Sequence, residues 1–118
     1  NLGVIKNELK YNENKLNKNV YWMYHIILKP HLIVSRASIR KKLSDLGVET
    51  REGFIPFHLQ DKFLKEGMVN PDDCPNATKV AYASFYLPSG PVISDKEQNY
   101  VVESVCTVLD EILFSLNY

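Results

Sequence analysis

The apolar positions of this chain repeat every second residue in some segments and about every three to four residues in others, which predicts a mixture of strands and helices. Residues 20–28, VYWMYHIIL, are aromatic and β-branched, with apolar side chains on both alternating faces. That composition predicts a central strand covered on each side, which Pro30 ends. We expect Trp22 and Tyr24 to be core residues on one face, and His25 to have a structural role on the other.

Two amphipathic helices stand out, because their apolar residues recur at helical spacing between recognisable ends. The first is expected over about residues 36–46, after the candidate N-cap Ser35 and before Gly47, a common helix terminator. The second begins with Ser94 and Glu97, whose spacing is a capping-box signature, and runs to the C-terminus. Its apolar stripe consists of Val101, Val105, Val108, Ile112 and Leu116.

The remaining segments are shorter and predict small elements joined by turns. They are a weak strand around Val4 and Ile5, a polar loop over 11–19, extended segments over 48–55 and 84–88, helices over 59–66 and 76–83, and a turn at 89–91. Strands and helices alternate without the spacing of parallel βαβ units. We therefore expect an α+β fold, with a small, largely antiparallel sheet and helices packed mainly on one face.

Length and composition narrow the class of protein. With 118 residues and 45% hydrophobic content, the chain is long enough for one domain, residues 1–118, with a core of its own. The 14 basic and 14 acidic residues balance, so nucleic acid is not an expected partner. No apolar run is long enough to cross a bilayer and no leader precedes the domain, so we expect a soluble cytoplasmic protein with no membrane partner.

Two cysteines lie far apart in the sequence, at Cys74 and Cys106, and have no second pair. This is neither the framework of a secreted disulfide protein nor the spacing of a zinc site. We expect both thiols to be reduced and structural, and we expect no metal site.

The segment VETREGFIPFHLQ, residues 48–60, gathers the best candidates for substrate binding. Arg51 offers a planar cation for a carboxylate or phosphate, or else is a surface arginine paired to a neighbouring glutamate. His58 follows a rigid proline and can hydrogen-bond a substrate, although a single histidine near a loop is more often structural. Gln60 offers a neutral donor and acceptor to a ligand, or else caps the next short helix.

Five stretches of the chain, in this order, resemble the C-terminal small domain of the pyridoxal-phosphate-dependent sugar-nucleotide aminotransferases of the DegT/DnrJ/StrS group. They are NVYWMYHI (19–26), SRASIRKKLSDLGVETR (35–51), FIPFHLQ (54–60), CPNATKVA (74–81) and FYLPSG (85–90). No single stretch is decisive, but together they extend over nearly the whole chain.

The resemblance implies the small domain of the aspartate-aminotransferase fold, within an enzyme of amino-sugar biosynthesis for surface polysaccharides or antibiotics. Enzymes of this group are homodimers that transfer an amino group, usually from glutamate, to a nucleotide-linked keto-sugar. The lysine that holds pyridoxal phosphate as a Schiff base lies in their large N-terminal domain, and this chain has no counterpart of that motif. We therefore expect a fragment that begins at Asn1 without methionine, contains no catalytic residue and is inactive alone.

The same resemblance implies that the end of the 48–60 segment turns toward the cofactor cleft, so that His58, Arg51 and Gln60 position the substrate. One departure concerns Glu52 and Gly53, because many members have proline and an aromatic residue at these two places. The added charge and backbone freedom weaken the role carried over to Arg51 more than the one carried over to His58.

Two other functions remain open from the sequence. A dehydratase of the same group, which has histidine in place of the Schiff-base lysine, would have the same small domain. A free-standing α+β ligand-binding or regulatory module of this size would need no further sequence.

Overall fold

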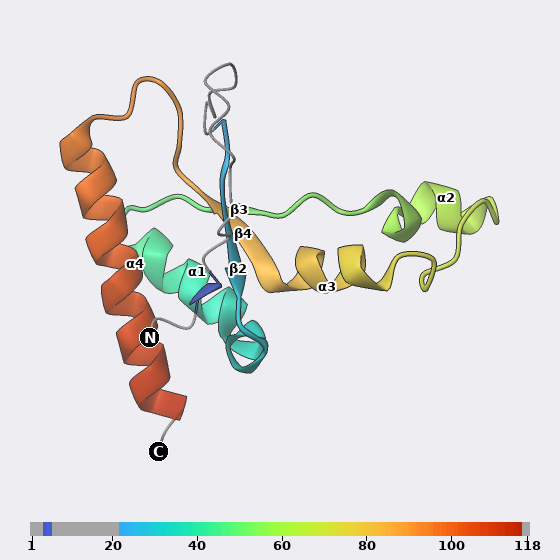
Figure 1. Cartoon of the computed structure of the whole chain (residues 1–118), viewed down its shortest axis with the longest axis horizontal. Coiled ribbons are helices and arrows are strands. Elements are labelled where there is room, and N and C mark those ends of the chain that lie inside the picture. The colour runs from blue at the N-terminus through green and yellow to red at the C-terminus, as the bar shows by residue number, and fades with distance from the viewer. Residues whose placement is uncertain (1–3, 6–21, 117–118) are drawn as a thin grey trace, which may run out of the picture.

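A small antiparallel sheet organises the chain in the computed structural model, which describes residues 4–5 and 22–116 (Figure 1). In these described residues four strands pair in the order β1-β2-β4-β3. The elements are β1 (Val4–Ile5), β2 (Tyr24–Leu28), the 3-10 turn η1 (Pro30–Ser35), α1 (Arg36–Asp45), β3 (Arg51–Glu52), the 3-10 turn η2 (Phe57–Leu59), α2 (Asp61–Lys65), α3 (Pro75–Ala83), β4 (Ser84–Leu87) and α4 (Asp95–Leu116).

The register of the strands decides which side chains share a face. Ile26 of β2 lies opposite Phe85 of β4, and the next pair along is His25 with Tyr86. Arg51 of β3 also lies opposite Tyr86, on the other side of β4. Because directly paired residues point to the same face and successive residues alternate, Ile26 and Phe85 share one face, and His25, Tyr86 and Arg51 share the opposite face.

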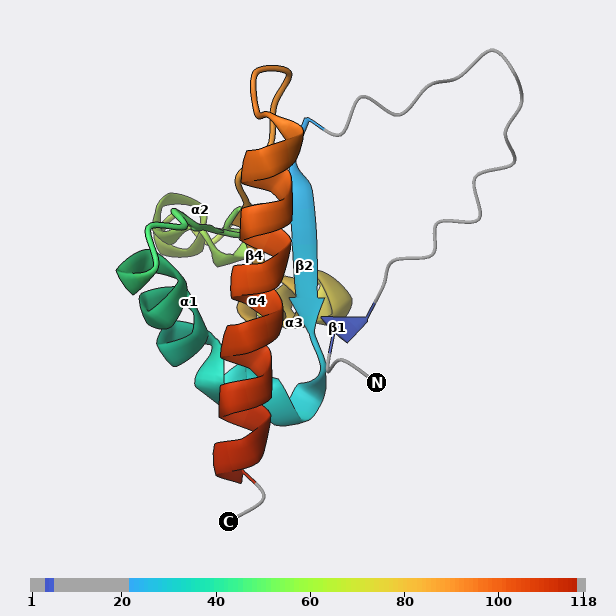
Figure 2. The ribbon, with the colours of Figure 1, turned by 90° about the vertical axis from the view of Figure 1, so that its left-hand side faces the viewer.

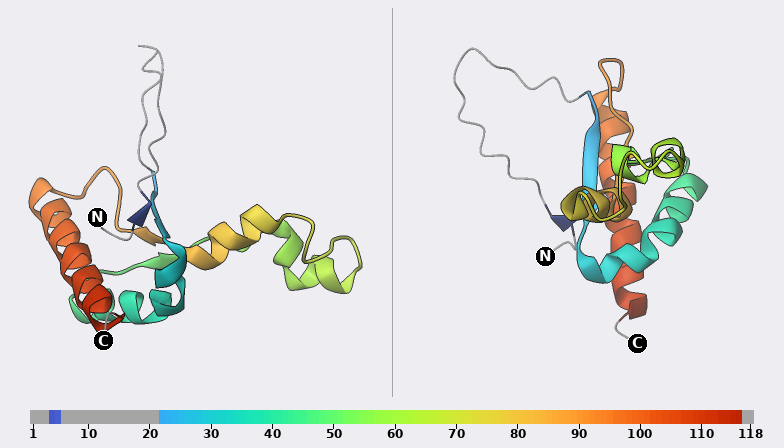
Figure 3. Two further views of the ribbon diagram at one scale, coloured as in Figure 1. Left: turned by 60° about the horizontal axis from the view of Figure 1, so that its bottom comes forward. Right: turned by 90° about the vertical axis from the view of Figure 1, so that its right-hand side faces the viewer.

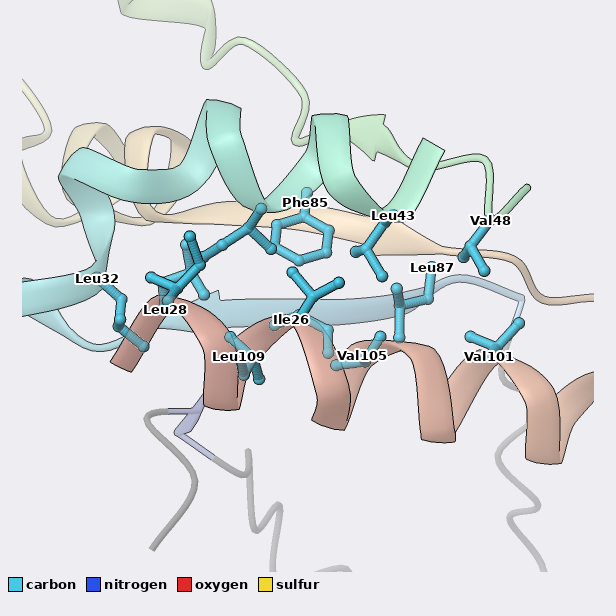
Figure 4. Packing of buried hydrophobic residues seen from close by; sticks show 13 residues of the cluster. Ile26, Leu28, Leu32, Leu43, Val48, Phe85, Leu87, Val101, Val105 and Leu109 are labelled. Carbon is cyan, nitrogen blue, oxygen red and sulfur yellow. The ribbon is translucent and has the colours of Figure 1, made fainter. Parts of the chain in front are cut away.

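Helices α1 and α4 cover the face that contains Ile26 and Phe85. Figure 2 shows α4 running alongside the sheet, with α1 beside it. Apolar side chains from both helices meet those of the two inner strands in one cluster (Figure 4). Its members are Ile26, Leu28, Leu32, Ile39, Leu43, Val48, Phe85, Leu87, Val101, Val105, Val108, Leu109 and Ile112. The predicted α+β class, with helices mainly on one face, is confirmed.

Both long helices begin and end close to the predicted residues. Helix α1 stops at Asp45, one residue before the expected end, and Gly47 follows in the left-handed region with φ 78°. Before α4, the Ser94 amide donates to Glu97 Oε2 at 2.8 Å, and the Glu97 amide donates to Ser94 Oγ at 3.3 Å. The capping box is therefore formed, and its hydrogen bonds from the Ser94 side chain and amide hold the pKa of the Glu97 carboxyl below its usual range.

Residues 54–83, called the arm below, project away from the sheet (Figures 1 and 3). The predicted helices over 59–66 and 76–83 are both present there, as α2 and α3. Phe57 stacks on Phe63 with ring centroids 3.8 Å apart, which joins η2 to α2. Several large apolar side chains of the arm nevertheless face solvent, namely Phe54, Ile55, Phe57, Met68, Val80 and Tyr82.

The predicted central strand is present as β2, between β1 and β4, but it is not covered on both sides over 20–28. Strand β2 begins at Tyr24, and residues 20 and 21 lie outside the described residues, as does the loop predicted over 11–19. Trp22 and Tyr24 are not core residues, because their side chains are 74% and 52% exposed. The physical reason is that α1 and α4 pack over the later part of the strand, where Ile26 and Leu28 are buried.

No helix among residues 22–116 is long and apolar enough to span a membrane. The same residues contain no cluster of three or more histidine, cysteine or acidic side chains able to hold a metal ion. Cys74 and Cys106 are unbridged thiols, and Cys74 is exposed, whereas Cys106 is partly buried.

Leu43 of α1 is fully buried in the apolar cluster, so we predict that Leu43→Ala lowers the free energy of unfolding by about 2–5 kcal/mol. Leu116→Ala is the matched control, since that leucine is 47% exposed, and it should cost less than about 1 kcal/mol. Urea denaturation of the two variants checks this. Equal losses would contradict the one-sided core.

Candidate functional site

The face of the sheet opposite α1 and α4, called the open face below, presents a row of three polar or aromatic side chains. Arg51, Tyr86 and His25 lie side by side across β3, β4 and β2. The His25 ring stacks on Tyr86 with centroids 4.5 Å apart and an interplanar angle of 22°. The row therefore combines a permanent cation with a flat aromatic platform.

Two hollows flank Tyr86 on this face. The first hollow, of about 310 Å³, is lined by Arg51 together with Trp22, Met23, Glu49, Pro88 and Ser89. The second hollow, of about 400 Å³, lies toward α3 and is lined by His25, Gly53, Phe54, Ser84 and residues of α3. Tyr86 contributes to both, so the two hollows are neighbours on one surface.

His25 and Ser84, which line the second hollow, each have a polar atom that lacks a hydrogen-bond partner among the described residues. These atoms, His25 Nε2 and Ser84 Oγ, are both buried. A buried polar atom left unpaired costs about 1–3 kcal/mol of stability, so a site that retains two of them calls for an explanation. Burial also lowers the pKa of His25, which keeps its imidazole neutral at pH 7.

Gly53 leaves the space that the Ser84 hydroxyl occupies. A Cβ at that position would lie 2.7 Å from Ser84 Oγ and 3.9 Å from His25 Nε2. The first distance is too short for any side chain without a shift of Ser84. The glycine that departs from the pattern expected of the family therefore makes room for the hydroxyl.

Glu52, the other departure, does not place its charge beside Arg51. Its Oε1 lies 2.6 Å from Arg40 Nη1 and 3.8 Å from Arg36 Nη2, both on α1. Since Glu52 is paired with Phe85, it faces the helices, whereas Arg51 faces the opposite side. The negative charge is thus neutralised on the covered face.

Arg51 itself is exposed and weakly held. Its Nη2 lies 3.6 Å from Glu49 Oε1, and both side chains are more than three-quarters exposed, at 77% and 80%. An exposed pair of this kind contributes little to stability. The guanidinium can therefore exchange Glu49 for an anionic group that enters the first hollow.

His58 and Gln60 lie in the arm and serve local contacts. His58 is 5% exposed, and its Nε2 lies 2.7 Å from Thr78 Oγ1. The Thr78 hydroxyl also lies 3.3 Å from the Cys74 carbonyl, and the tautomer of His58 decides whether its ring nitrogen donates to Thr78 or accepts from it. Gln60 Nε2 donates to the Ile55 carbonyl at 3.3 Å, and its side chain makes no cap bond to α2.

The structure thus separates the three candidates from the sequence. Arg51 lines the first hollow, whereas neither His58 nor Gln60 is among the described residues that line either hollow. His58 instead ties η2 to α3, whose residues form a wall of the second hollow. Sequence reasoning missed Tyr86, Ser84 and the contribution of His25 to this surface. For His25 the available signal was the alternation along β2, which directs His25 and Ile26 to different faces of the sheet.

In the part of the chain that the structure describes, no lysine at this surface is placed to hold pyridoxal phosphate as a Schiff base. Lys41 pairs with Asp45 and Lys42 with Glu111, on the helical side of the domain. No lysine among the described residues lines either hollow. These residues therefore do not by themselves fit the cofactor.

The chain is similar to known proteins both in sequence and in fold. The chain is 27% identical over 95 residues to GDP-perosamine synthase of Escherichia coli O157:H7. This match covers 80% of this chain and 24% of that protein. Among solved structures, one similar protein is Spr1654 of Streptococcus pneumoniae, which is assigned as a sugar aminotransferase and was solved in an apo form and a PMP form. Its TM-score is 0.72 and its sequence identity is 21%, and the match covers 81% of this chain and 24% of Spr1654.

PseC of Helicobacter pylori, an aminotransferase involved in the biosynthesis of pseudoaminic acid, matches with TM-score 0.68 and 15% identity over 75% of this chain and 24% of its own. The chain thus spans about a quarter of the length of the relatives that it matches. A family model covers residues 1–106, most of the sequence. The chain belongs to the DegT/DnrJ/EryC1/StrS aminotransferase family.

Proposed function

We propose that this chain is the C-terminal small domain of a pyridoxal-phosphate-dependent aminotransferase that acts on a nucleotide-linked keto-sugar in amino-sugar biosynthesis. The observation that carries the proposal is the one-sided sheet. One face is packed into the domain's own core, and the other presents Arg51, Tyr86 and His25 above two hollows. Such a face suits one wall of a cleft whose opposite wall is formed elsewhere in the enzyme.

Arg51 is the proposed contact for an anionic part of the substrate. Its planar guanidinium can donate two parallel hydrogen bonds to a phosphate or a carboxylate. Because the ion pair between Arg51 and Glu49 is long and exposed, replacing Glu49 with an anionic group of the substrate costs little free energy.

His58 and Gln60 are proposed to position the substrate, His58 through the arm. The buried hydrogen bond between His58 and Thr78 fixes η2 against α3. Gln60 is the single residue between η2 and α2. His58 would therefore affect turnover by holding the wall of the cleft in place rather than by proton transfer.

The cofactor, the amino donor and the partner subunit are also part of the proposal. Pyridoxal phosphate, held by a lysine outside this chain, would supply the electron sink for transamination. Glutamate is the proposed amino donor, and the working enzyme is a cytoplasmic homodimer. Membranes and nucleic acids are not proposed partners.

The exposed apolar side chains of the arm support docking onto the rest of the enzyme. Phe54, Phe57, Met68 and Tyr82 are between 54% and 66% exposed, and all belong to one projecting segment. Apolar residues gathered in this way are typical of a surface that another domain or subunit covers.

We predict that the 118-residue chain, purified alone, shows no shift of the pyridoxal phosphate absorbance on mixing and no transfer of an amino group from glutamate to a keto-sugar nucleotide. The physical reason is that no lysine among the described residues lines either hollow of the open face. Absorbance titration and product chromatography check this. Unaided turnover by the chain would overturn the proposal.

In the whole enzyme, we predict that His58→Ala keeps the cofactor absorbance but lowers turnover with the keto-sugar by about tenfold or more. Thr78→Val removes the hydroxyl from the same hydrogen bond and should produce a similar loss, because the arm loses the same tie. His31→Ala is the control, since His31 is exposed in η1. Steady-state kinetics with the three variants checks this, and unchanged kinetics in His58→Ala would remove His58 from the site.

A further inference from the structure

We propose that Arg36 is a positioning residue that fastens both ends of the arm to α1 and so sets the direction in which the arm leaves the sheet. The arm is joined to the sheet at two junctions, one after β3 and one before β4 (Figure 1). Arg36, the first residue of α1, contacts the chain at both junctions. The effect of that direction on substrate turnover rests on the proposed function, whereas the direction itself is a property of this chain.

The junction between α3 and β4 is held by hydrogen bonds from the Arg36 guanidinium. Its Nη1 donates to the Ala81 carbonyl at 3.1 Å and to the Ser84 carbonyl at 3.2 Å. Ala81 lies in the last turn of α3 and Ser84 is the first residue of β4, so one nitrogen bridges the two elements. The Arg36 side chain is only 21% exposed, and partial burial strengthens hydrogen bonds from a charged donor.

The junction after β3 is held by the carboxylate of Glu52, the last residue of that strand. Its Oε1 lies 3.8 Å from Arg36 Nη2 and 2.6 Å from Arg40 Nη1. Arg40 also donates from Nε to the Thr50 hydroxyl at 3.1 Å and from Nη2 to the Thr50 carbonyl at 3.2 Å. Two arginines one turn apart on α1 thus fix the end of β3, and Arg36 connects this junction to the one at α3.

The charge of Arg36 suits the end of α3 better than the start of its own helix. In α1, all of whose residues are described, the first turn has no acidic residue, although the N-terminal end of a helix favours negative charge. In α3, which is also fully described, the last turn has no basic residue, although a cation is favourable there and the last carbonyls need donors. Arg36 supplies that cation from 45 residues away in the sequence. Its placement therefore stabilises α3 and not α1.

Polar contacts decide the direction of the arm because little of the arm is buried. Among its described residues only His58 and Ala83 are buried. Helix α3 does contact β2, β4 and η1, but Ala83 is the one buried residue in this described helix. Burial of apolar surface, which fixes α1 and α4 against the sheet, therefore contributes little to the direction of the arm.

The same contacts bear on the open face. Ala81 and Ser84 line the second hollow, so Arg36 holds part of its wall through their carbonyls. Arg36 itself is not among the described residues that line either hollow. It therefore acts through the backbone of the wall and not by contact with a ligand.

Double electron–electron resonance measures the direction of the arm in the 118-residue chain. One nitroxide is attached to Cys74, which is exposed in the arm, and the other to Glu103→Cys on the exposed side of α4, in a Cys106→Ser background. We expect one narrow distance distribution. Arg36→Met keeps the stem of the side chain but removes its donors, and should broaden the distribution at least about twofold.

Three further variants separate the proposed role from a general loss of stability. Arg36→Lys restores a charged donor near the position of Nη1, where both carbonyls converge, and should give a distribution close to that of the wild type. Lys41→Ala removes an exposed cation of the same helix, paired with Asp45, and should change nothing. Glu52→Gln, at a side chain that is 61% exposed, loosens the other junction without disturbing the core and should broaden the distribution.

Any of four results contradicts the proposal. They are a broad distribution in the wild-type chain, an unchanged distribution in Arg36→Met or, if that variant does not fold, in Glu52→Gln, equal broadening by Arg36→Met and Arg36→Lys, and equal broadening by Arg36→Met and Lys41→Ala. The readout needs neither cofactor nor keto-sugar. Failure here therefore leaves transamination by the whole enzyme untouched, and failure of transamination leaves the direction of the arm measurable.

Discussion

Burial of only one face of the sheet determines which strand side chains enter the core and which reach the open face. Strands β2 and β4 place Ile26 and Phe85 against α1 and α4, and the alternation of a strand then forces His25 and Tyr86 to the other side. A shift of register by one residue would bury the polar row and expose the core. The hydrophobic packing that folds the domain therefore also orients its open face.

The two unusual residues after Arg51 are accommodated by the same constraint. Glu52 points to the helical side, where Arg40 and Arg36 hold its carboxylate, so its charge does not oppose Arg51. Gly53 returns to the open side and leaves space for Ser84 Oγ. A pair of residues that looked unfavourable for binding in the sequence becomes compatible with it once each residue is assigned to its face.

The elements with strong local signals could be predicted from the sequence, and those that depend on tertiary cover could not. The capping box before α4 and the glycine after α1 are local chemistry, and both are formed. Trp22 and Tyr24 were misjudged because aromatic composition indicates a strand but not whether a helix lies over it. For the site, Arg51 was recognisable by its charge, whereas Ser84 becomes notable only through its burial and its distance to Gly53.

The open face and the arm are proposed to turn toward the rest of a larger enzyme. Hydroxyl-radical footprinting of the whole enzyme and of the 118-residue chain measures whether they do. Met68 and Tyr82 of the arm are 62% and 58% exposed here and should lose most of their reactivity in the whole enzyme, while Tyr100 of α4, at 50%, should keep its own. Equal labelling of Met68 and Tyr82 in both proteins would contradict the account.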